Sequence, residues 1–277
     1  MPDRQLTRGD TGSDVEQAQG MLNRTGALLD EDGSFGPGTA RAVQACQTQH
    51  GLPASGVVDD STWAMLRALP EPCSDIATTA VNFIAQQEVS NRAHYDSVVA
   101  LPDYPGGDSG ITIGVGYDLR METGFVADWN NLLPAATMAA LRPCLGQQGT
   151  SAVAQALAGF PVPWDPAWTV FVSKSLPKYV AATQGAFPGF DALPMLCRGV
   201  LVSLVYNRGT AMTDDSPDDR RKEMREIRDA LQAGNPAAVP DLLRAMERLW
   251  PDARGLRDRR EAEAKLFEEG LAGSGQQ

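Results

Sequence analysis

The chain has 277 residues, 43% of them hydrophobic and 21% charged, and its formal net charge is −11. This length is sufficient for two domains with separate cores. No apolar run reaches the roughly 18–20 residues that a membrane-spanning helix requires, so we expect no membrane insertion. Acidic residues are interleaved with every run of lysines and arginines, so the chain lacks the basic patch that is typical of nucleic-acid binding.

Histidine is scarce, with only His50 and His94 in the whole chain. A zinc hydrolase commonly needs two or three imidazole ligands, and neither histidine has a nucleophile-bearing motif beside it. We therefore expect no metal site and chemistry carried by carboxylates, and a carboxylate hydrolase implies no organic cofactor. The N-terminal residues lack the basic start and apolar core of a signal peptide, so we expect synthesis in the cytoplasm without a cleaved signal.

Three helices are predicted within residues 1–70. The first is expected to start at 13–14, where small polar residues are favoured as helix caps. The second follows a glycine-rich loop and is expected from Thr39 to Gly51. The third is expected to start at 61–62.

The loops before the second and third helices resemble each other. Gly33 precedes Thr39 by six residues, and Gly56 precedes Thr62 by six. Each pair brackets a loop that leads into a helix, which indicates a small internal repeat.

Several segments of this region carry a family resemblance: RGDTGSDV, LNRTG, DGSFGPGTARAVQACQ and GLPASGVVDDSTW. They resemble the three-helix type of peptidoglycan-binding module. The resemblance implies that the muropeptide or glycan binds in a groove, and that this groove lies beside Asp32, Gly33, Phe35 and Thr39. From the residues alone, Phe35 and Trp63 can instead fill the core of a small domain, and for Trp63 we favour the core.

The segment LPEPCSD, residues 69–75, is predicted to be extended, because its prolines stop the preceding helix. We therefore predict a first domain at 1–70, a linker at 71–75, a second domain at 76–271 and a flexible tail at 272–277.

The helix expected after the linker, in SDIATTAVNFIAQQEVSN, places Glu88 on its apolar side, between Ala77 and Val81 in projection. A carboxylate on such a stripe is costly unless it is paired or protonated. Burial raises the pKa of a carboxyl group, which is what a general acid near neutral pH requires. A structural ion pair or a helix-end glutamate that reaches water explains the position equally well.

The segment PGGDSGITIGVGYDL follows, and its alternation predicts a short strand interrupted by glycines. Such glycines often mark close backbone approach to a ligand. A helical glutamate followed by a β-turn with Asp and Thr suits glycoside cleavage. One carboxyl protonates the leaving oxygen, while a second carboxylate with a hydroxyl orients water or stabilises the oxocarbenium ion. The aromatics of the middle region, Trp164, Trp168 and Phe171, are expected in the core rather than on a sugar-stacking surface.

Three segments resemble the phage-type lysozymes, glycoside hydrolase family 24: Glu88 followed by GITIGVGY, then LVSLVYNRGTAM, then GLRDRREAEAKLFEEG. Together they span about residues 76–270. The resemblance implies a mainly α (α+β) fold, in which a lysozyme-like domain with a small β-lobe follows the three-helix module. Substrate is then expected in the cleft between the lobes.

The resemblance also implies residue roles. Glu88 corresponds to the catalytic acid, and Thr112 to the threonine that opens the TIG strand. Tyr117 stands where the family often has histidine, and Asn207 ends the buried helix of the second segment. Arg259 corresponds to the arginine that salt-bridges the catalytic glutamate.

The position of Arg259 is unusual independently of the family resemblance, because it lies on the apolar side of its predicted helix. A buried arginine needs an acidic partner, which either Glu88 or Glu263 can supply.

The second carboxylate is not fixed by the resemblance, because the position six before Thr112, where the family has aspartate, is Gly106. Asp108 in the glycine turn is the first choice and Asp103 the second, whereas Asp118 is expected to be structural. If none of them serves, the enzyme works with a single carboxyl, as lytic transglycosylases do.

These features predict a monomeric peptidoglycan hydrolase in which a wall-binding module is tethered to a muramidase. The muramidase would cleave the β-1,4 bond between N-acetylmuramic acid and N-acetylglucosamine. The alternatives are a lytic transglycosylase and a non-catalytic peptidoglycan-binding protein. It would reach the periplasmic or extracellular wall either as a phage endolysin released through a holin or as a secreted, bacteriolytic effector. An effector would require an immunity protein in the producing cell.

Overall fold

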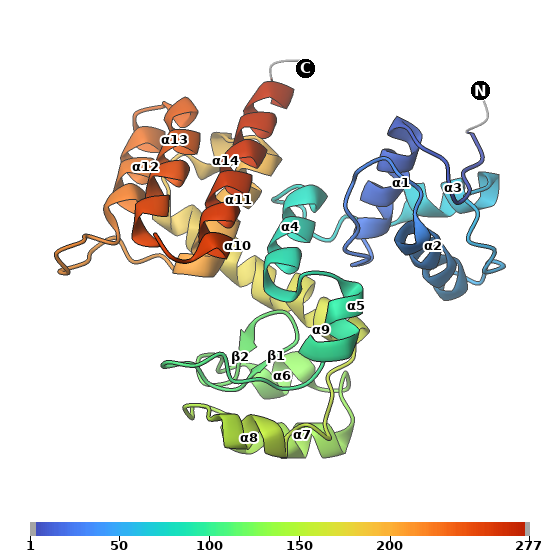
Figure 1. Cartoon of the computed structure of the whole chain (residues 1–277), viewed down its shortest axis with the longest axis horizontal. Coiled ribbons are helices and arrows are strands. Elements are labelled where there is room, and N and C mark those ends of the chain that lie inside the picture. Colours follow the sequence, from blue (N-terminus) through green and yellow to red (C-terminus); the bar gives the residue numbers. More distant parts are fainter. Residues whose placement is uncertain (1–3, 275–277) are drawn as a thin grey trace. The chain divides into compact units, whose positions relative to one another are not determined.

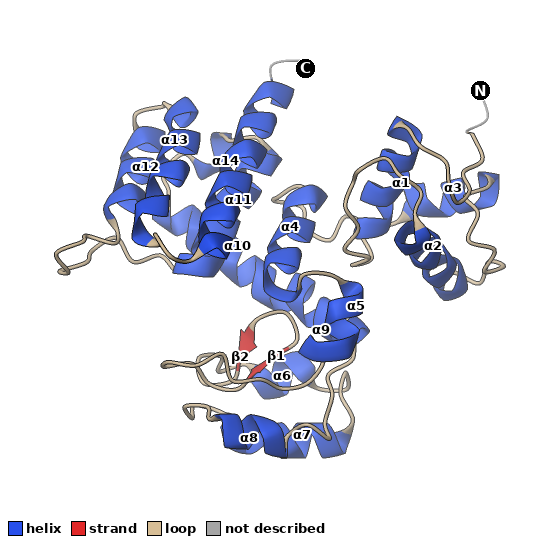
Figure 2. Cartoon of the chain, viewed as in Figure 1, coloured by secondary structure: helices blue, strands red, loops and turns tan. Residues whose placement is uncertain are grey.

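The computed structural model describes residues 4–274, which are mainly helical (Figures 1 and 2). The sheet in this part of the chain has two short strands. The mainly α fold class predicted from the sequence is therefore confirmed. No helix in the described range is long and apolar enough to cross a membrane.

The chain divides into two compact units. Unit 1 comprises residues 1–72 and 88–174, and unit 2 comprises residues 73–87 and 175–277. In this division the first 72 residues group with a large part of the predicted second domain, and the predicted domain boundaries stay a prediction. The reason lies in packing: at Gly26 a Cβ atom would be 2.5 Å from the ring of Trp168, so the two segments touch closely.

The N-terminal part of unit 1 contains the three predicted helices, α1 (Ser13–Asn23), α2 (Pro37–Gln49) and α3 (Asp60–Ala68). Their starts differ slightly from expectation. Helix α1 is capped by Gly12 without a side-chain hydrogen bond, and α2 begins at Pro37, which needs no N–H partner in a first turn. The side chain of Asp59 caps α3 by accepting a hydrogen bond from the Thr62 amide.

One core joins these three helices. It is made of Leu6, Val15, Ala18, Leu22, Phe35, Val43, Cys46, Val58, Trp63, Leu66 and Leu69. Trp63 is 1% exposed, and its indole N–H donates to the Arg4 carbonyl over 2.9 Å. Its predicted place in the core is confirmed.

Two buried glutamines explain the internal repeat. The Gln19 side-chain oxygen accepts from the Gly33 amide over 2.9 Å, and its amide nitrogen donates to the Thr39 hydroxyl over 3.3 Å. Gln47 binds the second loop in the same way, through the Gly56 amide at 3.0 Å and the Thr62 hydroxyl at 3.0 Å.

The glycines of the repeat are required by their conformation. Gly33 has a φ of 66° and Gly56 a φ of 72°, in the left-handed region that disfavours other residues. Each loop is thus shaped by a glycine and held by one glutamine from a neighbouring helix.

The rest of unit 1 consists of short elements around aromatic side chains. They are α5 (Arg92–His94), η1 (Tyr95–Val99), β1 (Thr112–Ile113), β2 (Tyr117–Asp118), α6 (Phe125–Trp129), α7 (Ala135–Leu141), η2 (Arg142–Cys144), α8 (Ser151–Ala156), α9 (Trp164–Val170) and η3 (Phe171–Ser175). Trp164, Trp168 and Phe171 are 3%, 8% and 1% exposed, which confirms their predicted place in the core.

Unit 2 is a helical assembly. It contains most of α4 (Thr78–Val89), then α10 (Leu176–Ala186), η4 (Phe190–Ala192), α11 (Met195–Arg208), α12 (Lys222–Gln232), η5 (Pro236–Ala238), α13 (Val239–Ala245), η6 (Met246–Leu249) and α14 (Arg254–Ser274). Helix α14 continues into the predicted tail at 272–277, and residues 275–277 lie outside the described part of the chain.

Helix α11 lies at the centre of unit 2, because two glycines let neighbouring helices approach it. A Cβ atom at Gly199 would lie 2.2 Å from that of Ala80 on α4, and one at Gly270 on α14 would lie 2.6 Å from the Cys197 sulfur. The side chains of α11 are accordingly buried from Val200 to Val205.

We expect Gln19→Ala to destabilise the N-terminal helices, because it leaves the buried Gly33 amide without its acceptor. Such a group costs about 1–3 kcal/mol, which corresponds to roughly tenfold to hundredfold faster amide exchange. Hydrogen exchange of peptides from residues 4–69, followed by mass spectrometry, measures this. Gln17→Ala, at an exposed position of the same helix, is the control and is expected to leave exchange unchanged. Equal exchange in both variants would contradict the role of Gln19.

Candidate active site

The predicted glycine-interrupted strand is a tight hairpin. Ile113 in β1 pairs with Tyr117 in β2, antiparallel, and the chain reverses between them. Gly114 and Gly116 have φ values of 58° and 68°, which other residues rarely adopt. The single strand expected from the alternation was therefore wrong, because these two glycines turn the chain back.

A third segment joins the hairpin at Asp103. Its amide donates to the Thr112 carbonyl over 3.0 Å, and the Thr112 amide donates to the Asp103 carbonyl over 2.8 Å. Residues that exchange both hydrogen bonds across an antiparallel pair point their side chains to the same face, with Cα atoms about 5.5 Å apart. The carboxylate of Asp103 and the hydroxyl of Thr112 are thereby neighbours.

Asp118 fixes the other side of the hairpin. Its carboxylate accepts from the Gly110 amide at 3.0 and 3.1 Å and from the Arg120 amide at 2.8 Å. A Cβ atom at Gly110 would lie 2.4 Å from an Asp118 oxygen and 2.6 Å from the Arg120 nitrogen. Asp118 thus has the structural role that the sequence indicated, and Gly110 is needed for the close approach.

A cleft of about 800 Å³ in unit 1 brings several of the predicted residues together. Glu88 lines it at the end of α4, and Asp103 and Thr112 line it from the bridged segments. Its far wall comes from α8, through Ser151 and Gln155. No motif in the sequence pointed to this wall, which tertiary packing alone supplies.

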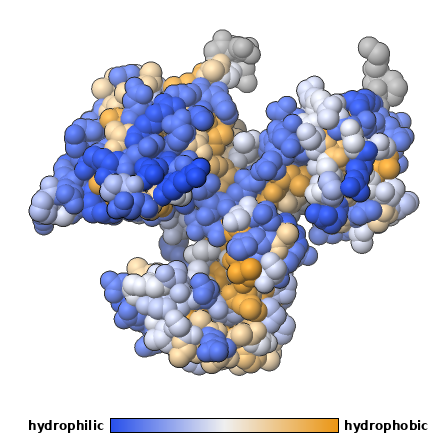
Figure 3. Space-filling view, viewed as in Figure 1, coloured by the Kyte–Doolittle hydropathy of each residue, from blue (hydrophilic) through white to orange (hydrophobic). Residues whose placement is uncertain are grey.

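The cleft also has an apolar wall. Val98 in the π-helical turn η1 is 54% exposed, and Leu101 just after it is 39% exposed. Figure 3 shows apolar surface gathered in unit 1 just below the position of α5 in Figure 1. An apolar wall beside carboxylate and hydroxyl groups matches a sugar ring, which has both apolar faces and polar edges.

Two predicted residues lie away from this cleft lining. The side chain of Asp108 is fully exposed, and its nearest cation is Arg120 at 3.9 Å. Tyr117 is 3% exposed, and its hydroxyl donates to an Asp128 oxygen over 2.8 Å. Burial, together with that hydrogen bond, raises the pKa of Tyr117. Tyr117 therefore anchors the hairpin to α6, and Asp108 faces solvent.

Arg259 and Asn207 belong to unit 2. Arg259 is 5% exposed, and its Nε lies 3.3 Å from a carboxylate oxygen of Glu263, which is fully buried. Glu263 also pairs with Arg260 at 3.1 Å. Of the two acidic partners anticipated for Arg259, Glu263 is thus observed, and pairing with Glu88 stays a prediction. The Asn207 side-chain oxygen accepts from Arg260 over 3.2 Å.

The residues of the expected peptidoglycan groove are largely internal. Phe35 and Thr39 are 2% and 3% exposed. Gly33 is also buried, and its amide donates a hydrogen bond to Gln19. Asp32 is exposed, but its carboxylate is engaged by Gln19 and by the Ser34 amide, which lowers its pKa. These side chains shape the loop, and only Asp32 reaches the surface.

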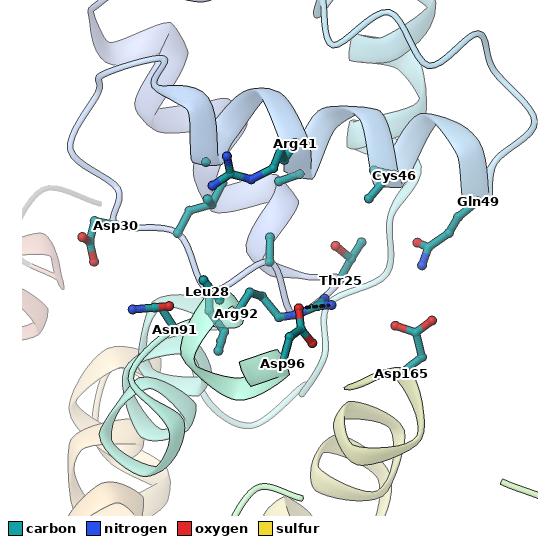
Figure 4. Close-up of a pocket in the computed structure, with 16 residues that line it drawn as sticks. Thr25, Leu28, Asp30, Arg41, Cys46, Gln49, Asn91, Arg92, Asp96 and Asp165 are labelled. Carbon is teal, nitrogen blue, oxygen red and sulfur yellow. Dashed lines mark hydrogen bonds and ion pairs between the residues drawn. The ribbon is translucent and has the colours of Figure 1, made fainter. Parts of the chain in front are cut away.

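A second cavity in unit 1, of about 550 Å³, lies beside that loop (Figure 4). Arg41 and Gln49 reach into it from α2, and Arg92 and Asp165 face them from α5 and α9. Arg92 is held 3.4 Å from Asp96. Leu28, Leu29, Ala42, Ala45 and Cys46 supply apolar lining. This concave, mixed surface is better suited to ligand contact than the buried residues that the resemblance singled out.

Comparison with known proteins identifies the N-terminal module. Residues 11–66 match the family described as "Putative peptidoglycan binding domain". Over 81 residues the chain is 38% identical to the zinc D-Ala-D-Ala carboxypeptidase of Streptomyces albus G, covering 28% of this chain and 30% of that protein. Over 63 residues it is 43% identical to an uncharacterized protein in the bpoA1 3′ region of Kitasatospora aureofaciens, covering 22% of this chain and 53% of the relative. The protein therefore carries a peptidoglycan-binding domain, and it spans about half or less of these relatives.

Among solved structures, the crystal structure of a Burkholderia AP3 phage endolysin aligns with 97% of this chain and 100% of its own. The identity is 18% and the TM-score is 0.23, which is too low to establish a common fold.

We expect Gly110→Ala to disrupt the hairpin, because the added Cβ would overlap both the Asp118 carboxylate and the backbone nitrogen of Arg120. Overpacking of this kind costs about 1–3 kcal/mol or more. The matched control is Gly159→Ala, since no atom lies within 4 Å of the added methyl group there. Thermal unfolding and hydrogen exchange of residues 103–120 measure both variants. A Gly110→Ala protein as stable as the control would contradict this account of the hairpin.

Proposed function

We propose that the protein is a muramidase, a peptidoglycan hydrolase that cleaves the β-1,4 bond between N-acetylmuramic acid and N-acetylglucosamine. The observation that carries the proposal is the pairing of Asp103 with Thr112 in a cleft that Glu88 also lines. Glycoside hydrolysis needs two carboxyl groups at the cleft. Asp118 lines the cleft as well, but the backbone amides of Gly110 and Arg120 already engage its carboxylate.

In this proposal Glu88 is the general acid. It donates its proton to the glycosidic oxygen as the bond to the anomeric carbon breaks, so that the leaving sugar departs as a neutral alcohol. The carboxylate of Asp103 stabilises the oxocarbenium ion or takes a proton from the attacking water, and the Thr112 hydroxyl orients that water. The water oxygen ends on the anomeric carbon, which leaves a reducing end.

Asp103 is preferred over Asp108, the first choice from the sequence, for two reasons. The first is position: Asp103 lines the cleft, whereas the Asp108 side chain is fully exposed to solvent. The second is rigidity, because two backbone hydrogen bonds hold Asp103 beside Thr112. A catalytic carboxylate must be held within a fraction of an ångström of its productive place, which a bridged segment does better than an open glycine turn.

The peptidoglycan-binding domain supports this function by tethering. A weakly binding module raises the local concentration of the polymer at the cleft, so neither site needs high affinity alone. In our proposal the cavity of Figure 4 receives part of the wall polymer. The protein would reach the wall by holin release, as an endolysin, or by secretion as an effector, in which case an immunity protein occupies the cleft.

The direct test is mass spectrometry of the muropeptides that the full chain releases from purified peptidoglycan. Wild type is expected to release muropeptides with reducing ends. Glu88→Gln and Asp103→Asn are each expected to slow release by about 10²–10⁴-fold, because each removes a proton-transfer or charge-stabilising group. Asp108→Asn is the matched control and is expected to retain activity within about twofold, since an exposed side chain contributes little to the transition state.

Other outcomes separate the alternatives. Anhydro-muropeptides from wild type would reassign the enzyme to the lytic transglycosylases. Loss of activity in Asp108→Asn, with Asp103→Asn active, would return the second carboxylate to the glycine turn. Binding to peptidoglycan without any release by folded wild type would leave a wall-binding protein.

A further inference from the structure

Unit 2 contains a cavity of about 530 Å³ that none of the proposed catalytic carboxylates lines. It is formed where α11 ends, by the following loop and by Trp250. Three arginines line it, Arg208, Arg220 and Arg221, against a single aspartate, Asp214. In a chain with a net charge of −11, such a local excess of positive charge is notable.

Two of these arginines donate hydrogen bonds to neutral groups, while the charges of Glu223 and Asp214 act on Arg208 and Arg220. Arg208 donates to the Arg220 carbonyl, and Arg221 donates to the Arg208 carbonyl over 2.7 Å. Carbonyl oxygens satisfy N–H groups but carry no net charge. The carboxylate of Asp214 is itself engaged, because it accepts from the backbone amides of Ser216 and Arg220, each at 2.9 Å.

One more arginine, Arg260, shares the Trp250 ring with Arg208 and is itself paired with Glu263. The guanidinium groups of Arg208 and Arg260 lie 5.0 and 5.8 Å from the centre of the Trp250 ring. Burial, together with the nearby charges of Arg221, Arg260 and Arg220 and opposed by that of Glu223, lowers the pKa of Arg208 to about 10. The Nε of Arg208 is buried and has no hydrogen-bond acceptor among residues 4–274. Like charges gathered in one place cost stability unless an anion joins them.

We infer that this cavity is a binding site for an oxyanion, a carboxylate or a phosphate group. The planar guanidinium group matches both anions, because it donates two parallel hydrogen bonds to two oxygens. Asn207 and Thr213, which also line the cavity, add neutral polar groups to the rim. The inference rests on these residues of unit 2 alone and does not depend on the proposed glycosidase activity.

Arg220 is the residue to change, because its side chain is exposed and its hydrogen bonds with Arg208 and Asp214 are made by its backbone. Arg220→Gln keeps a side chain of similar reach without the charge. Arg228→Gln is the matched control: it removes one arginine from α12, outside the cavity, where Arg228 pairs with its neighbour Asp229.

The experiment is a titration of the full chain, at constant ionic strength, followed by two-dimensional NMR of the arginine Nε–H groups. The probes are inorganic phosphate, the dipeptide N-acetyl-D-alanyl-D-alanine, and chloride as the non-specific anion. We expect saturable shifts with phosphate, the dipeptide or both, and at least about tenfold weaker binding in Arg220→Gln but not in Arg228→Gln.

The two probes distinguish the source of the anion. Saturation by phosphate alone identifies a phosphoryl ligand, and saturation by the dipeptide alone identifies a peptide carboxylate. The inference is overturned if neither probe saturates, if chloride produces the same shifts at the same concentration, or if the two variants weaken binding equally.

Discussion

Two backbone hydrogen bonds between Asp103 and Thr112 are the contact on which the cleft of unit 1 depends. They place a segment that follows η1 alongside the hairpin, so that a carboxylate and a hydroxyl share one face. The hairpin in turn exists because glycines at 114 and 116 reverse the chain. Its outer loop is packed against Gly149, where a Cβ atom would lie 2.8 Å from the Gly110 carbonyl oxygen. The hairpin and its outer loop thus rely on close backbone approaches at Gly110 and Gly149 and on the backbone conformation of Gly114 and Gly116.

In the N-terminal module, long loops in a small domain are held in place by buried polar side chains. Gln19 and Gln47 bury their amides and convert two irregular loops into fixed structure. A buried amide is favourable only when its donors and acceptors are satisfied, which both glutamines achieve. The result is a module whose loops are shaped by polar groups buried inside it.

Charge is distributed unevenly in unit 2. In the buried group of unit 2, Arg259 and Arg260 both pair with Glu263, and three arginines line the cavity of the same unit together with Asp214. The two groups differ in burial, because Arg260 is fully buried against Glu263 whereas Arg220 of the cavity is exposed. The proposed muramidase site is different in kind, because its carboxylates face an open cleft where substrate replaces water.

The mainly helical fold was implied by the family resemblance. The sequence alone determined the three helices of the N-terminal module, the core positions of Trp63 and Trp168, the structural role of Asp118 and a buried arginine at 259 with either Glu88 or Glu263 as its partner. These follow from local periodicity, helix caps and the cost of burying charge, all of which act over a few residues. It did not determine which aspartate accompanies Thr112, because Asp103 reaches that threonine through a backbone pairing that spans a loop. It also missed the α8 wall, the cavity beside α2 and the arginine cavity. Those features are made by segments far apart in the chain, and only tertiary packing decides which of them meet.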